Sequence, residues 1–347
     1  MITGIIRKGE KKPEGPFGDH LGYYSLQHDF PVMDVLKVYH RKDPLWHFTV
    51  VGRPPAEDSS FGYMIHNIVK PLTPQEFPGV VEIHAVDAAG VHPLLLAIGK
   101  ERYMPFRDTQ PEEILTIANH ILGSGQTSLS KFLFIAADTE GGSLSTKKIP
   151  EFFNFILERI DLNRDLHFQT KTTMDTLDYS GTGMNQGSKI VIAAAGKKRR
   201  ELTANLPDNF TLPSGFSKPK FVQKGILAIK APKFNSNTEG GQQAQNLCDY
   251  LKNFDLKGIP MVIMVDDADF VTQTLNNFLW VTFTRANPSH DIHGVNATIE
   301  HKHWGCTTMV IDARIKPHHA PVLEVDAKMK ERVDKLFAKG GALEGLY

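Results

Sequence analysis

Two matching apolar stretches decide the fold: Phe132-Leu133-Phe134-Ile135-Ala136-Ala137-Asp138 and Met261-Val262-Ile263-Met264-Val265-Asp266-Asp267. Each run stays apolar until a carboxylate ends it, which is typical of a parallel strand buried on both faces. Three further pairs of segments match in the same order: residues 94–100 with 225–230, 154–157 with 277–280, and 189–194 with 309–313. The order strand, helix, strand, helix, strand in each copy predicts two tandem α/β modules.

The helices of these modules are indicated by their ends and by their apolar faces. Residues 114–122 follow Pro111 and two acids and stop before Gly123, which are start and stop signals of a helix. Residues 274–283 are apolar nearly all round, so we expect that helix to be buried.

A charged triplet is repeated with the same spacing, as Arg159, Asp165 and His167 in the first copy and as Arg285, Asp291 and His293 in the second. Each arginine and aspartate is either a catalytic pair or a structural ion pair or loop cap. Duplication favours the structural interpretation, because a scaffold feature is copied with its module.

Composition limits the class of protein. The 347 residues, 41% of them apolar, are enough for two or three domains with their own cores. The 39 basic and 39 acidic residues cancel, which argues against a nucleic-acid or polybasic membrane surface. Two cysteines, Cys248 and Cys306, argue against a disulfide framework and fit a reducing compartment. We therefore expect a cytoplasmic protein with no membrane span and no nucleic-acid partner.

The N-terminal part of the chain contains a short polar stretch, Pro13-Glu14-Gly15-Pro16-Phe17-Gly18-Asp19-His20. Proline and the two glycines predict a shaped turn rather than a helix or regular strand. A turn that holds Glu14, Asp19 and His20 together beside aromatic residues suits proton transfer, since burial and neighbouring charges set carboxyl pKa values. A polar loop between two strands is the alternative.

The segment Glu14 to Tyr24, EGPFGDHLGYY, closely resembles the signature of the UbiD-type decarboxylases, the polyprenyl-hydroxybenzoate carboxy-lyase family that uses prenylated flavin mononucleotide (FMN). The resemblance continues in the same order through Phe30-Pro31-Val32, His40-Arg41-Lys42 and Val51-Gly52-Arg53-Pro54-Pro55, followed by Glu57 and Asp58. It implies a carboxy-lyase (a lyase) of the kind related to ubiquinone biosynthesis.

The resemblance also implies the domain organisation. The fold class is α/β (α+β overall): residues 1–90 are the remnant of a split β-barrel that carries the catalytic carboxylates. Residues 91–200 are the first α/β module, 201–224 a linker, and 225–347 the second module with a C-terminal helix. In the family this barrel follows a segment that supplies most of the flavin and metal site, so we expect that segment to be missing here.

Site roles carry over residue by residue. Glu14 matches the glutamate that pairs with an arginine of the family, and Asp19 matches the acid that protonates the product carbon, where many members have glutamate. Candidates for the substrate or cofactor side are Pro16, Phe17, His20, Ser60 and Met64. Residues 59–64 are alternatively the start of a helix packed on the barrel.

The implied cofactors are prenylated FMN with manganese and potassium, whose ligands match nothing in this chain. Low-ranked metal candidates come from the residues themselves: His301, His303 and Cys306 have types and spacing that suit zinc. Ordinary hydrogen-bonded histidines are the favoured interpretation, because Lys302 and Lys316 add positive charge.

Loss of CO₂ from an unsaturated or aromatic acid leaves electron density that side chains cannot accept, so a cofactor must accept it. The resemblance implies a decarboxylase of aromatic or α,β-unsaturated carboxylic acids. Its implied partners are an N-terminal half or partner subunit, a flavin prenyltransferase that supplies the cofactor, and further copies of the chain in a homo-oligomer. The alternative is a non-catalytic assembly or regulatory module built on the duplicated α/β domain.

Overall fold

A computed structural model describes residues 1–46, 49–103, 106, 108–138 and 142–346. The chain forms two compact units: residues 1–53 together with 320–347, and residues 54–319. The C-terminal helix therefore belongs to the same unit as the N-terminal strands, and not to the second α/β module as predicted. Within the described part of the chain, none of the helices combines the length and hydrophobicity that crossing a bilayer requires.

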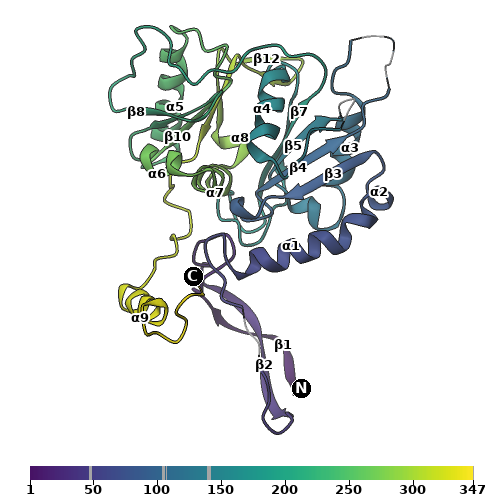
Figure 1. The fold of residues 1–347 in the computed structure, drawn as a ribbon, viewed down its shortest axis with the longest axis vertical. Helices are drawn as coiled ribbons and strands as arrows, with labels where there is room; N and C mark the ends of the chain where they lie inside the picture. Colours follow the sequence, from purple (N-terminus) through teal and green to yellow (C-terminus); the bar gives the residue numbers. More distant parts are fainter. Residues whose placement is uncertain (47–48, 104–105, 107, 139–141, 347) are drawn as a thin grey trace. The chain divides into compact units, whose positions relative to one another are not determined.

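The first unit contains a two-stranded antiparallel ribbon and one helix (Figure 1). Strand β1 (Ile2–Glu14) pairs with β2 (His28–Val38), with an irregularity between Ile6 and Lys11. Helix α9 (Ala327–Phe337) begins at Asp326, whose side chain accepts a hydrogen bond from the Met329 amide. The described residues form no closed barrel, and Glu14 ends a regular strand rather than lying in the turn, because its backbone pairs with His28.

The second unit contains two five-stranded sheets. The first has the order β3-β4-β5-β7-β6: β3 (Val80–Ala85), β4 (Leu94–Gly99), β5 (Phe132–Ala137), β7 (Gly187–Ala194) and β6 (Leu166–Thr172). The three central strands are parallel, and both edge strands are antiparallel to their neighbours. This sheet begins at Val80 rather than after residue 90, since β3 pairs with β4.

The second sheet has the order β8-β9-β10-β14-β11: β8 (Ser217–Gln223), β9 (Ile226–Lys230), β10 (Met261–Val265), β14 (Thr308–Asp312) and β11 (Ile292–Val295). Its central strands are again parallel and its edges antiparallel, so the two sheets share one topology. Strand β8 lies inside the predicted linker, because it adds an antiparallel edge to β9.

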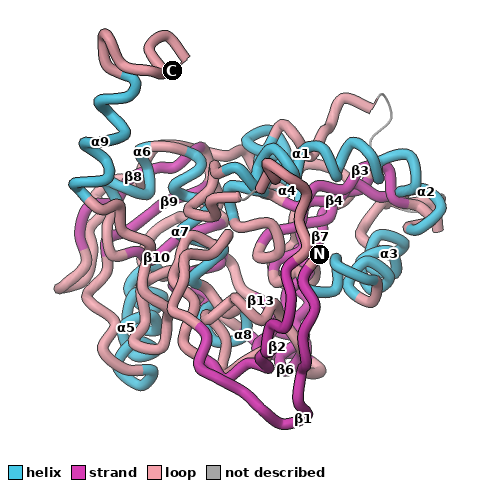
Figure 2. The backbone as a smooth tube through the Cα atoms, turned by 90° about the horizontal axis from the view of Figure 1, so that it is seen from below, coloured by secondary structure: helices cyan, strands magenta, loops and turns pink. Residues whose placement is uncertain are grey.

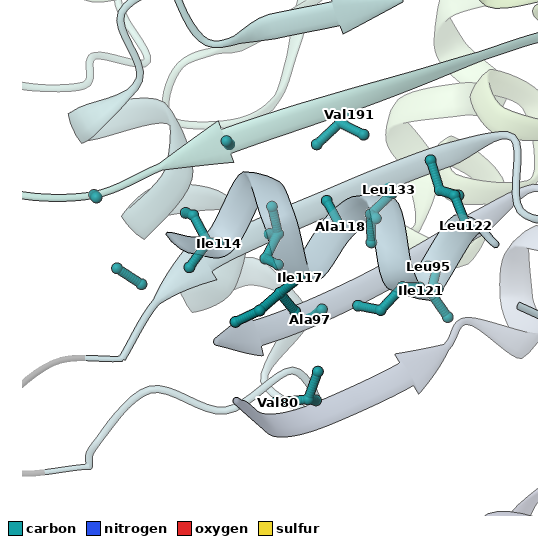
Figure 3. Close-up of a cluster of buried hydrophobic side chains, with 14 residues drawn as sticks. Val80, Leu95, Ala97, Ile114, Ile117, Ala118, Ile121, Leu122, Leu133 and Val191 are labelled. Atoms are coloured by element: carbon teal, nitrogen blue, oxygen red, sulfur yellow. The ribbon is translucent and has the colours of Figure 1, made fainter. Parts of the chain in front are cut away.

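Helices cover both faces of the sheets. Figure 2 shows α3 (Glu113–Leu122) and α4 (Ile149–Arg159) on opposite sides of the first sheet, and α5 (Asn237–Leu251) and α6 (Ala268–Gln273) on opposite sides of the second. The α3 face is apolar: Ile114, Ile117 and Ile121 pack on the side chains of the central strands (Figure 3). This burial explains why the central strands are apolar on both faces.

Further elements complete the second unit. They are α1 (Glu57–Val69), α2 (Thr73–Glu76), α7 (Leu275–Arg285), α8 (Pro288–Asp291), β12 (Thr298–Glu300), β13 (His303–Gly305), and three 3₁₀ turns, Lys70–Leu72, Asp87–Ala89 and Gly125–Leu129. Helix α7 is buried along its length from Asn277 to Arg285, as its sequence predicted.

Helix α7 joins the two modules through aromatic packing. The ring of Phe283 lies 5.1 Å from that of Phe132 on β5 and stacks on Phe153 of α4, with ring centroids 6.2 Å apart. Phe278 contacts Phe153 at 6.1 Å. The core of the first module therefore continues into a helix of the second.

Candidate functional site

The stretch after β1 is a tight reversal held by backbone hydrogen bonds. Gly15 has a φ of +92°, and a Cβ there would lie 2.9 Å from the Ser25 hydroxyl oxygen, so only glycine fits. The Ser25 amide donates to the Phe17 carbonyl over 2.8 Å, and the Ser25 hydroxyl accepts from the Phe17 amide over 3.1 Å. The predicted shaped turn therefore exists, one residue after Glu14.

Asp19 opens the tip of this reversal. Its amide donates to the Tyr23 carbonyl over 3.0 Å, and the Gly22 amide donates back to the Asp19 carbonyl over 2.9 Å. Carboxylate Oδ1 accepts from the His20 amide over 2.6 Å and lies 2.8 Å from His20 Nδ1. Asp19 is only 8% exposed, and its Oδ2 is buried without a hydrogen-bond partner among the described residues. A buried acceptor left unsatisfied is costly, which marks this atom as one that awaits a partner.

The other predicted residues of this stretch lie in a different environment. Glu14, Pro16 and Phe17 are exposed, and His20 is half-buried. Across the described residues of this unit, no hydrogen bond joins Glu14 to Asp19. The structure thus brings Asp19 and His20 together, while Glu14 is an exposed residue at the end of β1 where the turn begins.

The C-terminal segment contributes contacts that sequence reasoning missed. The Tyr24 amide donates to the Pro321 carbonyl over 2.8 Å, and the Leu323 amide donates to Gly22 over 3.1 Å. A Cβ on Gly18 would lie 3.1 Å from a methyl group of Leu323. No local pattern announces such a contact, because it joins residues near opposite ends of the chain.

Ser60 and Met64 lie on α1 in the other compact unit, and both side chains are exposed. Neighbouring Ser59 fixes the start of that helix: its hydroxyl accepts from the Ala56 amide over 3.1 Å and donates to Asp87 over 2.6 Å. The predicted position of Ser60 and Met64 on the substrate or cofactor side therefore stays a prediction.

The aspartates of the repeated charged triplets are loop caps, and each lies beside a cation from outside its own triplet. Asp165 accepts from the Asp161 amide over 2.9 Å, and Asp291 accepts from the Asn287 amide over 2.6 Å, in both cases four residues earlier. Their cations differ: Arg164 for Asp165, at 2.6 Å, and Lys316 for Asp291, at 3.3 Å.

The second unit contains a buried ion network that sequence reasoning did not find. Lys131 Nζ lies 2.7 Å from the Asp178 carboxylate and 2.7 Å from the Ser180 hydroxyl. Burial lowers the pKa of Lys131, although Asp178 opposes this shift. Burial also raises the pKa of Asp291, against the effect of Lys316. These groups are closed off and mutually bonded, so the network is structural.

The zinc candidates are separated. The His301 side chain is 94% exposed at the tip of the β12–β13 hairpin, whereas Cys306 is fully buried and burial raises the pKa of its thiol to about 12. His303 lies instead against His167 of β6, with ring centroids 5.4 Å apart. Burial, and next the neighbouring His303, lowers the pKa of His167 to about 4.

Known proteins resemble this chain in sequence. Residues 1–54 match the family profile of the 3-octaprenyl-4-hydroxybenzoate carboxy-lyase Rift-related domain, and residues 59–194 match that of the C-terminal domain of the same carboxy-lyase. An uncharacterised protein of Chlamydia trachomatis is 37% identical over 329 residues, covering 94% of this chain and 53% of that protein. A Chlamydia pneumoniae protein, named as one of the subunits of a 4-hydroxybenzoate decarboxylase, is 37% identical over 338 residues, covering 96% and 54%.

A solved structure also resembles this chain: the UbiD-class enzyme HmfF of Pelotomaculum thermopropionicum in complex with FMN. It has a TM-score of 0.43 and 19% identity, and the likeness covers 57% of this chain and 41% of that one. The chain spans about half the length of the curated relatives it matches.

Proposed function

The chain belongs to the UbiD family of carboxy-lyases, and on that premise we propose that it is part of a decarboxylase of aromatic or α,β-unsaturated acids. In this reaction the bond to the carboxyl carbon breaks, CO₂ leaves, and a proton replaces it on the same carbon. Prenylated FMN, when bound, supplies the electron sink that side chains lack. The chain's own residues have the task of holding and delivering the proton.

One observation carries the proposal: Asp19 Oδ2 is buried and lacks a partner among the described residues, whereas Oδ1 is occupied by His20. The two carboxylate oxygens of Asp19 thus have different roles. Hydrogen bonds to Oδ1 orient the carboxyl group, and Oδ2 is left to carry the proton to the product carbon. A positioned acid of this kind contributes a factor of roughly 10²–10⁴ to the rate.

The remaining roles follow from the family resemblance. Glu14, at the exposed end of β1, pairs with an arginine of another segment, and Pro16, Phe17, Ser60 and Met64 face substrate or cofactor. The ligands of the flavin phosphate, of manganese and of potassium are supplied by an N-terminal half or a partner subunit. A flavin prenyltransferase supplies the cofactor, and the complex is cytoplasmic and homo-oligomeric.

Exposed apolar side chains on the ribbon support the need for a companion segment. Ile6 and Leu36 are each 65% exposed, and Val35 and Val38 are more than half exposed. A two-stranded ribbon is marginally stable by itself, so further strands or a packed layer are needed to bury these side chains. Helix α1 has no buried residue and exposes Tyr63, Met64 and Ile68 in the same way.

The test is flavin absorbance and titration of the purified chain with manganese and potassium, before and after addition of the N-terminal half of a full-length relative. We expect binding and decarboxylation only after mixing. Asp19→Asn should then lower kcat about 100-fold or more, and Glu14→Gln should also impair turnover, while Glu10→Gln on the same strand leaves turnover unchanged.

Two results would contradict the proposal. Tight flavin binding by the chain alone would mean that the α/β modules build their own cofactor site. Absence of binding in both preparations would favour the non-catalytic assembly module.

A further inference from the structure

A cavity of about 350 Å³ lies where the two α/β modules meet. Edge strand β6 of the first sheet forms one wall with His167 and Phe168, and the β12–β13 hairpin forms the other with His303 and Trp304. Phe168 and Trp304 meet edge to face, with ring centroids 5.5 Å apart. The cavity is large enough for several ordered waters, because one water needs about 30 Å³.

Two imidazoles meet at this cavity, one from each module. The rings of His167 and His303 have centroids 5.4 Å apart and planes tilted by 57°. The Nε2 atom of each ring is buried without a hydrogen-bond partner in the described part of the chain. A single unsatisfied buried nitrogen is costly, and two on neighbouring rings are costlier, so a shared partner would remove both penalties at once.

We propose that His167 and His303 bind one divalent transition-metal ion of the zinc and nickel class through their Nε2 atoms, with waters of the cavity completing the coordination. Imidazole suits these ions. Metal–nitrogen bonds of about 2.0–2.1 Å at a tetrahedral angle place two ring centroids about 5 Å apart, close to the spacing seen here.

The surroundings select these two rings over the others nearby. His301, two residues before His303, points into solvent at 94% exposure, and Cys306 is buried as a protonated thiol. Two nearby positive side chains would repel a bound metal ion, but the charge of each is offset. Arg164 is paired with Asp165 at 2.6 Å, and Lys302 is an exposed residue whose ammonium group water can solvate.

Such an ion would add a further link between the two modules. The hairpin already contacts the first module through its backbone, because the Cys306 amide donates to the Leu162 carbonyl over 3.1 Å. A ligand that binds only the folded protein raises its stability, so metal should stabilise the junction.

The experiment uses the full chain, freed of metal with a chelator, at pH 7.5, where an ordinary histidine is mostly neutral. Calorimetric titration with Zn²⁺ and with Ni²⁺ should show one saturable site, and Zn²⁺ should raise Tm. His167→Gln and His303→Gln should each lower the affinity at least tenfold and abolish the rise in Tm. Co²⁺ bound at the site should show the visible absorption of tetrahedral coordination in the wild type only.

The matched control is His301→Gln, on the same hairpin, which should keep wild-type affinity. His318→Gln tests adventitious binding by the His318–His319 pair and should also change nothing. Urea unfolding of each metal-free variant checks that it folds. Wild-type affinity in the His167 and His303 variants, loss of binding in either control, or absence of a saturable site would overturn the proposal. No flavin is present, so the result is independent of the decarboxylase proposal.

Discussion

Helices α4 and α7 occupy matching positions in the two modules, yet they are buried in different ways. Helix α4 buries one face, with Phe152, Phe153, Ile156 and Leu157, and leaves Phe155 half-buried. Helix α7 buries nine consecutive residues, from Asn277 to Arg285. The difference shows that α4 keeps one face partly open to solvent, although Phe153 contacts α7, whereas α7 is enclosed on all sides.

The capping aspartates show the same contrast. Asp165 and Asp291 accept the same backbone hydrogen bond, but the Arg164 side chain that pairs with Asp165 is one-third exposed, whereas Lys316, which pairs with Asp291, is nearly fully buried. A repeated local motif thus keeps its backbone function in both modules. The contribution of each capping aspartate to stability depends on how deeply its partner cation is buried.

The largest expected effect comes from Phe283→Ala. This substitution should lower the free energy of unfolding by about 3–5 kcal/mol, because it leaves a cavity among Phe132, Phe134 and Phe153. The same substitution at the half-buried Phe155 of α4 should cost less than half as much. Urea denaturation measures both, and equal costs would contradict the contrast between the two helices.

The next effect is that of Asp291→Ala. Its removal leaves Lys316 buried without its carboxylate, so we expect a loss of about 3 kcal/mol of stability. Asp165→Ala should cost about 1–2 kcal/mol, since water can solvate the partly exposed Arg164. Thermal and urea unfolding of the two variants measure the difference. A larger loss of stability from Asp165→Ala than from Asp291→Ala would contradict the expectation that the buried ion pair is the more sensitive to removal of its carboxylate.

The smallest effect concerns His167 and His293, which occupy matching positions on the edge strands. The pKa of His167 is about 4 in the folded protein, below its ordinary value, so the unfolded chain takes up a proton first as pH falls. Above pH 6.5 both states have a neutral His167, and the free energy of unfolding is unaffected by this group. As pH falls from 6.5 to 4, protonation of the unfolded chain lowers the free energy of unfolding by about 1 kcal/mol after allowance for solvent screening.

In metal-free protein, His167→Gln should remove that part of the pH dependence. His293→Gln should remove less, because burial lowers the pKa of His293 but Asp312 and Asp291 oppose the shift. Chemical denaturation at several pH values measures both. An unchanged profile in His167→Gln would show that another group causes the acid sensitivity.

Much of the fold could be predicted because its signals are local. The apolar runs at 132–137 and 261–265 became parallel central strands, and α3 begins and ends close to its proline, acid and glycine signals. The edge strands were harder. Strands β3 and β8 extended the sheets beyond the predicted boundaries, since their pairing depends on a neighbour and not on a pattern of their own.

The candidate site was predictable only in part. The turn at Asp19 followed from Gly15, Pro16 and Gly18, whose backbone preferences act within a few residues. The packing of Leu323 on Gly18, and the meeting of His167 with His303, join residues far apart in the chain. Sequence spacing instead suggested His303 with His301 and Cys306, which the hairpin separates because one is exposed and the other is buried.

The sequence by itself determined the family, the α/β class and the identity of the turn with its acid, because motifs and apolar periodicity are local properties. Tertiary structure alone decided which oxygen of Asp19 is left without a partner among the described residues and which histidines meet at the junction. It also decided that Asp291 pairs with a buried lysine while Asp165 pairs with a partly exposed arginine. Burial and charge pairing depend on which distant segments pack together, and no local pattern encodes that packing.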